Sequence, residues 1–299
     1  MIRRGSETRI ARLCKLFGKS RQAYYSKRTY EEIRGMEEAV VLDLVRAIRK
    51  DLPKTGVPKL HRMLAPDLAE HGIRMGRDRL NKLLRSHGLM VRIRTRKVRT
   101  TWSSHRFRKW SNLAEELVPD RPEQLWVSDI TYIRLRDGFA YLSLVTDAYS
   151  RKLMGFHLSQ TLEARGPIAA LRMALQNRRY PGQPLIHHSD RGIQYCCDQY
   201  VQMLQNEDIA ISMTQSGNPT DNPIAERMNG IFKRELGLNR RFKSYREVLP
   251  VILKAVYLYN ERRLHSSVDF LTPAEAHRRT GPLKRHWKKA RRKDEIIYT

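Results

Sequence analysis

The chain has 299 residues, and its 58 Lys and Arg face only 31 Asp and Glu, which gives a formal net charge of +27. An excess of this size favours a polyanionic partner, so nucleic acid, either DNA or RNA, is expected. Three cysteines exclude a disulfide scaffold, and no apolar stretch is long enough for a membrane helix or a secretory signal, so the expected location is cytoplasmic.

Residues 1–30 are predicted to form a short helix-turn-helix-like unit. Apolar residues recur at helical spacing before Gly18, and Ser20 can cap a second helix. Arg21 lies at the start of that helix and is a candidate DNA contact. The alternative is a solvated helical pair at the end of a domain.

Residues 31–90 are predicted to form a helix-turn-helix DNA-binding domain. Apolar residues at helical spacing indicate three helices, with glycines at the breaks between them. A basic last helix is typical of a reader of the DNA major groove, although basic helical faces also serve only to solubilise a surface. The third helix carries the candidate DNA contacts Arg77, Arg79, Lys82 and Arg85.

Residues 91–120 are predicted to be a basic linker. Residues 92–109 contain no acidic side chain, and the candidate DNA contacts Arg96 and Lys97 lie among them. Aromatic residues such as Trp102 and Trp110 are interleaved with these charges. Such a segment either becomes ordered on DNA or is a spacer whose tryptophans pack on the next domain.

Residues 121–281 are predicted to form an α/β catalytic core with carboxyl-terminal helices. The pattern indicates three strands joined by short turns, followed by alternating helices and strands in the order β-β-β-α-β-α-β-α. This is the order of an RNase H-like fold, a mixed five-stranded sheet with flanking helices. The strands are expected at residues 125–135, 139–147, 152–158, 184–189 and 209–213, and the helices at 164–177, at 198–206 and beyond Asn222.

Three carboxylates are candidate catalytic residues because of their positions. Asp129 lies inside the first strand, where an unpaired charge is costly, and Asp190 directly follows the fourth strand. Glu226 lies near the start of a helix that Asn222 can cap. Hard oxygen ligands suit Mg²⁺ or Mn²⁺, and three carboxylates can hold two such ions about 4 Å apart.

Other residues near these positions have competing interpretations. Lys233 lies two helical turns after Glu226 on the same face and is expected to grip DNA. Asp147 and Asp221 are rival carboxylates, and each of the acidic candidates taken alone can be a cap, a pairing partner or a surface group. Zinc is not expected at His187, His188, Cys196 and Cys197, because adjacent strand residues point to opposite faces.

The spacing and the words around the three carboxylates resemble one family. Thirty-five residues separate Asp190 from Glu226, which resembles the arrangement of retroviral integrases and many bacterial transposases. The local sequence is similar to that of the insertion sequence three family, as its second-frame product. The segments that carry this resemblance are 126–133, 188–195, 216–227, 259–265 and 271–275.

The resemblance implies a DNA transposase that binds the terminal inverted repeats of a mobile element and performs metal-dependent strand cleavage and strand transfer. It implies catalysis by Asp129, Asp190 and Glu226 with Mg²⁺ or Mn²⁺, and assembly on double-stranded DNA as a homo-oligomer, at least a dimer. It further implies a nucleoid-associated bacterial protein that works fused to, or assisted by, a small helix-turn-helix protein from an upstream frame.

Two other functions compete with the transposase. A nuclease or resolvase on the same fold would cut DNA without joining it, and a regulator would bind DNA without chemistry. The last segment, residues 282–299, is a basic tail that is expected either to clamp phosphates or to be disordered.

Overall fold

The computed structural model describes residues 10, 12–91, 108–215 and 222–286. The chain divides into two compact units, residues 1–92 and 93–299. Arg96, Lys97, Asp221 and most of the basic tail lie outside the described residues. Within the described ranges, no helix combines the length and apolar character that crossing a membrane requires.

The first unit is organised around one long helix, α2 (Arg21–Asp51), which begins where Ser20 accepts a hydrogen bond from the Ala23 N–H at 3.0 Å. The sequence indicated separate helices here, with a break near residue 30, but the structure has one continuous helix. Two ion pairs between residues four apart span the expected break, and a third follows it. They join Lys27 to Glu31, Arg28 to Glu32 and Arg34 to Glu38.

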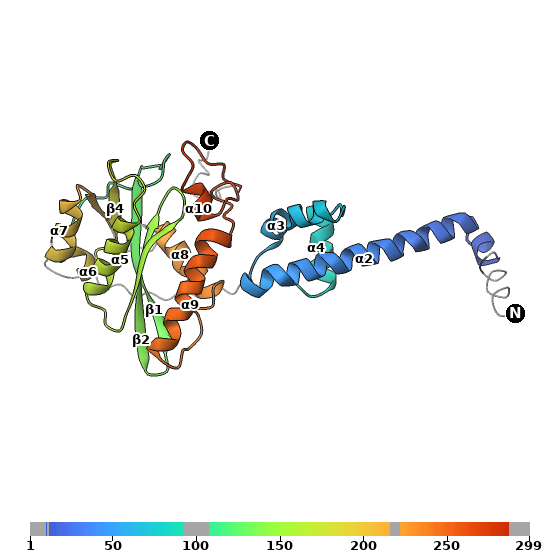
Figure 1. Cartoon of the computed structure of the whole chain (residues 1–299), viewed down its shortest axis with the longest axis horizontal. Helices are drawn as coiled ribbons and strands as arrows, with labels where there is room; N and C mark the ends of the chain where they lie inside the picture. Colours follow the sequence, from blue (N-terminus) through green and yellow to red (C-terminus); the bar gives the residue numbers. More distant parts are fainter. Residues whose placement is uncertain (1–9, 11, 92–107, 216–221, 287–299) are drawn as a thin grey trace, which may run out of the picture. The chain divides into compact units, whose positions relative to one another are not determined.

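Helices α3 (Val57–Glu70) and α4 (Arg77–Ser86) pack against the carboxyl-terminal half of α2 (Figure 1). The three helices share an apolar core that includes Val41, Leu60 and Leu80, all fully buried. The amino-terminal half of α2 lies beyond this core and exposes large apolar side chains to solvent. The core of the first unit therefore begins near residue 41 and ends with α4.

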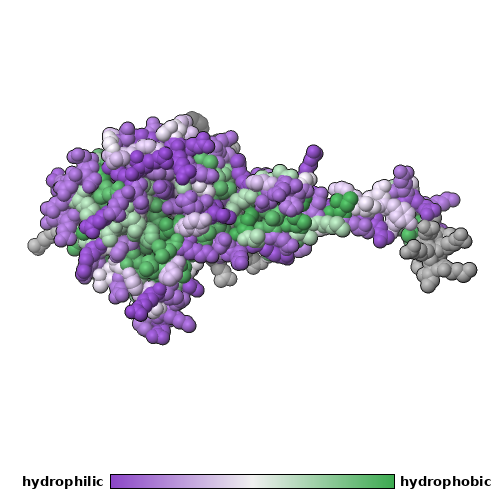
Figure 2. Space-filling model, in the orientation of Figure 1, coloured by the Kyte–Doolittle hydropathy of each residue, from purple (hydrophilic) through white to green (hydrophobic). Residues whose placement is uncertain are grey.

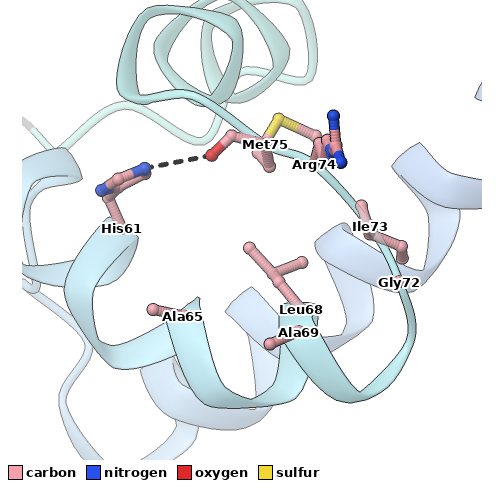
Figure 3. Close-up of a pocket in the computed structure, with 8 residues that line it drawn as sticks. All are labelled: His61, Ala65, Leu68, Ala69, Gly72, Ile73, Arg74 and Met75. Atoms are coloured by element: carbon pink, nitrogen blue, oxygen red, sulfur yellow. Dashed lines mark hydrogen bonds between the residues drawn. The ribbon is translucent and has the colours of Figure 1, made fainter.

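A pocket of about 470 Å³ lies beside the turn between α3 and α4 (Figure 3). Its wall is closed by a hydrogen bond of 3.0 Å between His61 Nε2 and the Met75 carbonyl oxygen. Small and apolar side chains such as Ala65 and Leu68 form much of the remaining lining. The pocket follows from the glycine at residue 72, whose positive φ of 65° turns the chain away from the end of α3.

The second unit is built on a five-stranded sheet with the strand order β3-β2-β1-β4-β5. The first three strands form an antiparallel meander, β4 pairs with β1 in parallel, and β5 pairs with β4 in parallel. The predicted order of elements is confirmed, and the mixed sheet is RNase H-like. The strands are β1 (Leu125–Leu135), β2 (Gly138–Asp147), β3 (Leu153–Ser159), β4 (Ile186–Ser189) and β5 (Ala210–Met213).

Helices cover both faces of this sheet (Figure 1). Trp126 points into a core with helices α5 (Arg165–Gln176), α6 (Ile193–Cys196) and α7 (Asp198–Asn206). Val127, the next residue, points to the opposite face, where Ala225 of helix α8 (Pro223–Arg234) packs against it. Helix α9 (Tyr245–Tyr257) lies on the α8 side, and the short helices η2 (Leu258–Arg262) and α10 (Pro273–Ala276) follow.

The surface reflects the composition. Hydrophilic side chains cover most of the visible face in Figure 2, with hydrophobic patches between them. Trp110, one of the interleaved tryptophans, packs against the core of the second unit, as one of the two linker interpretations predicted. Trp102 lies outside the described residues.

A buried polar cluster joins the beginning of β1 to the end of the second unit. The fully buried Glu123 accepts hydrogen bonds from the Arg179 and Tyr180 N–H groups and contacts His277 Nε2 at 3.1 Å. Asp147 accepts a hydrogen bond of 2.7 Å from the Glu123 N–H. Burial lowers the pKa of His277, but its hydrogen bonds to Asp147 and Glu123 outweigh burial and raise it. The cluster therefore acts as a charged internal clasp.

The amide of Asn260 completes the outer edge of the sheet. Its Oδ1 accepts from the Leu153 N–H at 3.0 Å, and its Nδ2 donates to the Leu153 carbonyl oxygen at 3.1 Å. These two hydrogen bonds take the place of those that a neighbouring strand would make with the start of β3, which is the edge strand. The π-helical turn η2 holds Asn260 in this position, and the adjacent Tyr259 hydroxyl donates to the Arg151 carbonyl oxygen at 2.9 Å.

Asn260→Asp is expected to destabilise the second unit by about 3 kcal/mol, because the carboxylate cannot donate to the Leu153 carbonyl oxygen. Urea unfolding of the full chain measures the loss, which shrinks at lower pH, where the protonated acid regains a donor. The exposed Asn239→Asp is the control. Equal losses in the two variants would contradict the strand-edge role.

Candidate active site

The pairing of β1 with β4 brings Asp129 and Asp190 together. The parallel register aligns Leu125 with Ile186 and Val127 with His188. The same register, carried two residues further, places Asp190 level with Asp129. Asp129 lies within β1, whereas Asp190 directly follows the last residue of β4. The two predicted carboxylates therefore meet at the carboxyl end of β4.

Backbone and amide donors hold both carboxylates in place. Asp129 Oδ1 accepts from the Ile130 N–H at 2.8 Å, and Asp129 Oδ2 accepts from Asn229 Nδ2 at 2.5 Å. Asp190 Oδ1 accepts from the Gly192 N–H at 2.9 Å. A Cβ atom at residue 192 would lie 2.9 Å from that same oxygen, so a larger residue there would displace the Asp190 carboxylate.

The electrostatics of the site favour a cation. Burial, together with the neighbouring charge of Asp190, raises the pKa of Asp129 to about 7 despite the opposing Ile130 N–H, Asn229 and Lys233. Burial lowers the pKa of Lys233, and the charge of Asp129 opposes this effect. The negative charge of the two adjacent carboxylates is thus only partly balanced by Lys233. A divalent metal ion would stabilise such a pair of carboxylates.

Helix α8 presents a row of four polar side chains across β1. Asn222, at its amino terminus, donates to the Ser128 carbonyl oxygen at 3.4 Å, and Asn229 reaches Asp129. Glu226 lies between these two asparagines on the same helical row, and Lys233 follows at the next turn, within electrostatic reach of Asp129. The helix is therefore attached to β1 on both sides of Glu226.

Glu226 itself is exposed. Among the residues that the structure describes, no three His, Cys, Asp or Glu side chains lie close enough to share a metal ion, so Glu226 does not join the other two carboxylates. Like charges repel, and an exposed carboxylate on the first turns of a helix keeps its hydration. The structure thus brings together two of the three predicted residues, Asp129 and Asp190. The third, Glu226, lies on the row of polar side chains that α8 presents across β1.

A hydrogen-bonded group supports Asp129 from the opposite face of the sheet. His187 Nε2 contacts Ser128 Oγ at 2.7 Å and the Tyr200 hydroxyl at 2.9 Å. Burial lowers the pKa of His187 to about 3, so the ring is neutral. His188 points to the other face and contacts Ser212 Oγ at 2.9 Å. The two adjacent histidines therefore serve separate faces.

The remaining candidates have distinct surroundings. Arg77, Lys82 and Arg85 are exposed on α4, and Arg21 is exposed at the start of α2. The rival carboxylate Asp147 belongs to the buried clasp with Glu123.

Arg79 differs from its neighbours on α4. Its guanidinium lies 3.0 Å from Glu37 and 3.7 Å from Glu38, and it also donates to the Arg74 carbonyl oxygen at 3.2 Å. This side chain therefore links α4 to α2.

The sequence analysis gave no role to Asn229, which lies on the same face of α8 as Glu226 and Lys233. The signal was its spacing, three residues after Glu226 and four before Lys233. The hydrogen bond to Asp129 joins residues that are 100 positions apart in the chain, so only the fold reveals it.

Comparisons with known proteins relate the chain to integrases and transposases. Two models described as "Integrase core domain" match residues 119–219 and 207–273. An uncharacterized 31 kDa protein of insertion element IS600 from Shigella sonnei is 32% identical over 88% of this chain and 96% of its own length. The transposase of insertion sequence element IS629 from Shigella sonnei is 34% identical over 74% of this chain and 73% of its own length.

A third relative matches most of the chain. The transposase InsF of insertion sequence IS3A from Escherichia coli is 27% identical over 90% of this chain and 94% of its own length. The matches thus extend over both compact units and not only over the sheet.

Asn229→Leu is expected to weaken Mn²⁺ binding about 10–100-fold, because Asp129 loses the amide that orients it. Calorimetric titration of the full chain with Mn²⁺ measures the effect, and Asn239→Leu, at an exposed asparagine, is the control. An unchanged affinity in Asn229→Leu would show that this amide does not support a metal site.

Proposed function

The chain belongs to the insertion sequence three family of transposases, and from this membership we propose that Asp129, Asp190 and Glu226 form its catalytic metal centre. The protein is a DNA transposase, a DDE-type polynucleotidyl transferase with an integrase core that depends on a divalent metal ion. It binds DNA and forms oligomers. The alternatives without strand joining are not favoured.

The observation that carries the catalytic proposal is the register between β1 and β4. It holds Asp129 beside Asp190, and Glu226 lies on α8 between two asparagines that contact β1, which supports its role as the third carboxylate. A set of three carboxylates fits hard cations, and Mg²⁺ or Mn²⁺, two per site, is the proposed complement.

The proposed chemistry divides between the cations and the side chains. When bound, the metal ions would activate the attacking oxygen and stabilise the leaving oxygen of the phosphodiester. Asn229 orients the Asp129 carboxylate, and Gly192 fixes that of Asp190. Lys233 contributes positive charge beside Asp129, where a DNA phosphate would lie.

The first unit is proposed to bind the element ends. Residues 31–90 form the proposed DNA-binding domain, in which the exposed Arg77, Lys82 and Arg85 of α4 contact DNA and Arg79 maintains the attachment to α2. Arg21, Arg96 and Lys97 are further proposed phosphate contacts. The specific DNA is proposed to be the terminal inverted repeats, and the active form is proposed to be at least a dimer. A small helix-turn-helix protein from an upstream frame is the proposed fusion partner.

Asp190→Asn is expected to lower strand-transfer activity on the order of 10³-fold, because the site loses one proposed metal ligand. Labelled DNA carrying the element end, with Mg²⁺ present, reports joined and cleaved products. Glu207→Gln, at an exposed acid after α7, is the matched control. Full joining by Asp190→Asn would refute the catalytic assignment, whereas cleavage without joining by the native chain would indicate a nuclease.

Lys82→Ala is expected to weaken DNA binding and to reduce the slope of log affinity against log salt by about one, because it removes one phosphate contact. Arg79→Ala is expected to lower the unfolding temperature of the first unit, because Glu37 and Glu38 lose their partner. Fluorescence anisotropy and thermal unfolding separate the two effects. A smaller salt slope in Arg79→Ala alone would reverse the assignment of these residues.

A further inference from the structure

The segment of residues 110–117, near the end of the predicted linker, lies beside β5, and we call this segment the strap. β5 is an edge strand of the sheet. The Met213 N–H donates to the Ser111 carbonyl oxygen at 3.3 Å, and the Leu113 N–H donates to Ser212 Oγ at 2.8 Å. The strap therefore covers the end of an edge strand with both backbone and side-chain hydrogen bonds.

The strap contacts both faces of the sheet. Trp110 packs against the core on the α5 side. Ala114 and Leu117 pack instead against the apolar cluster on the α8 side, which we call the α8 cluster and which includes Val127 of β1 and Ala225 of α8. The strap therefore crosses the edge of the sheet between Trp110 and Ala114, and its last part belongs to the face that carries Asp129.

Ser212 connects the strap to β4. Its Oγ accepts the hydrogen bond from the Leu113 N–H and also contacts His188 Nδ1 at 2.9 Å. Both Ser212 and His188 are buried. Since His188 lies two residues before Asp190, one side chain joins the strap to the strand that leads to this carboxylate.

The α8 cluster also reaches the residues next to Glu226. Ala225 is buried in this cluster, Ile224 is partly buried against it, and Glu226 is the next residue of α8. The polar attachment of this end of the helix is long, because Asn222 donates to the Ser128 carbonyl oxygen at 3.4 Å, near the limit for a hydrogen bond. The position of the first turn of α8 therefore depends mainly on apolar packing.

We propose that Leu117 is a positioning residue of the metal centre. By fixing the first turn of α8, it limits the positions from which Glu226 approaches a cation held by Asp129 and Asp190. The inference rests on the proposed function of these three carboxylates. Leu117 is the larger of the two side chains that the strap adds to the α8 cluster. Its contact matters because a metal site tolerates only a small displacement of a ligand.

The test measures the Mn²⁺ affinity of the full chain by calorimetric titration. Leu117→Ala is expected to weaken Mn²⁺ binding about tenfold, because the loosened first turn of α8 presents Glu226 in more positions. Leu117→Met keeps the apolar volume and is expected to bind Mn²⁺ as the native chain does. Native affinity in Leu117→Ala, or an equal loss in Leu117→Met, would contradict a role that depends on packing.

Leu175→Ala is the matched control, because this leucine is also partly buried but packs against the core on the α5 side. Its truncation is expected to lower the unfolding temperature, as Leu117→Ala does, and to leave the Mn²⁺ affinity at the native value. Thermal unfolding of both variants separates a loss of stability from a loss of positioning. Equal Mn²⁺ affinities in the two alanine variants would overturn the proposal.

A double-mutant cycle tests whether Leu117 acts through Glu226. Glu226→Gln is expected to weaken Mn²⁺ binding, and the addition of Leu117→Ala is expected to weaken it no further. A further tenfold loss in the double variant would refute the positioning role, since Leu117 would then act on another part of the site. Native affinity in Glu226→Gln would refute the proposed metal centre itself, whereas a loss in Glu226→Gln with native affinity in Leu117→Ala would refute only the role of Leu117.

Discussion

Everything in the second unit depends on holding two carboxylates side by side in spite of their repulsion. The parallel pairing of β1 with β4 imposes this arrangement, because the register that aligns Val127 with His188 also aligns Asp129 with Asp190. A shift of one residue would turn Asp190 to the other face of the sheet. Trp126 and His187, both fully buried, resist such a shift, since it would turn each side chain to the other face of the sheet.

The rest of the core fixes the position of α8 relative to that pair. Asn222 and Asn229 attach the helix to β1, and its far end is held by Glu235, which the buried Arg263 contacts at 2.8 Å. Arg263, which is almost fully buried, therefore has a structural role at the end of α8. The helix carrying Glu226 is anchored at both ends, while Glu226 itself stays exposed and free to approach a cation.

Much of this structure could be predicted from the local pattern of the sequence. The strands of the meander alternate or follow apolar runs, and the breaks fall at glycine and asparagine, so the element order, Asp129 and Asp190 could be predicted. Long-range contacts could not. The pairing of Arg79 with Glu37 and the bond from Asn229 to Asp129 join segments that are far apart in the sequence, and helical spacing says nothing about them. The continuity of α2 was missed because ion pairs on its surface leave no apolar periodicity.

The buried clasp of Glu123, Asp147 and His277 has a consequence for how the protein is made. Glu123 and Asp147 leave the ribosome early, but the histidine that contacts Glu123 is synthesised more than a hundred residues later. Until then Arg178, 3.6 Å from Glu123, is the only one of these basic partners in place, and the contacts of His277 with Glu123 and Asp147 are missing. We therefore expect the second unit to reach its full stability only when translation has passed residue 277, so that a chain interrupted earlier would be less stable than the complete one.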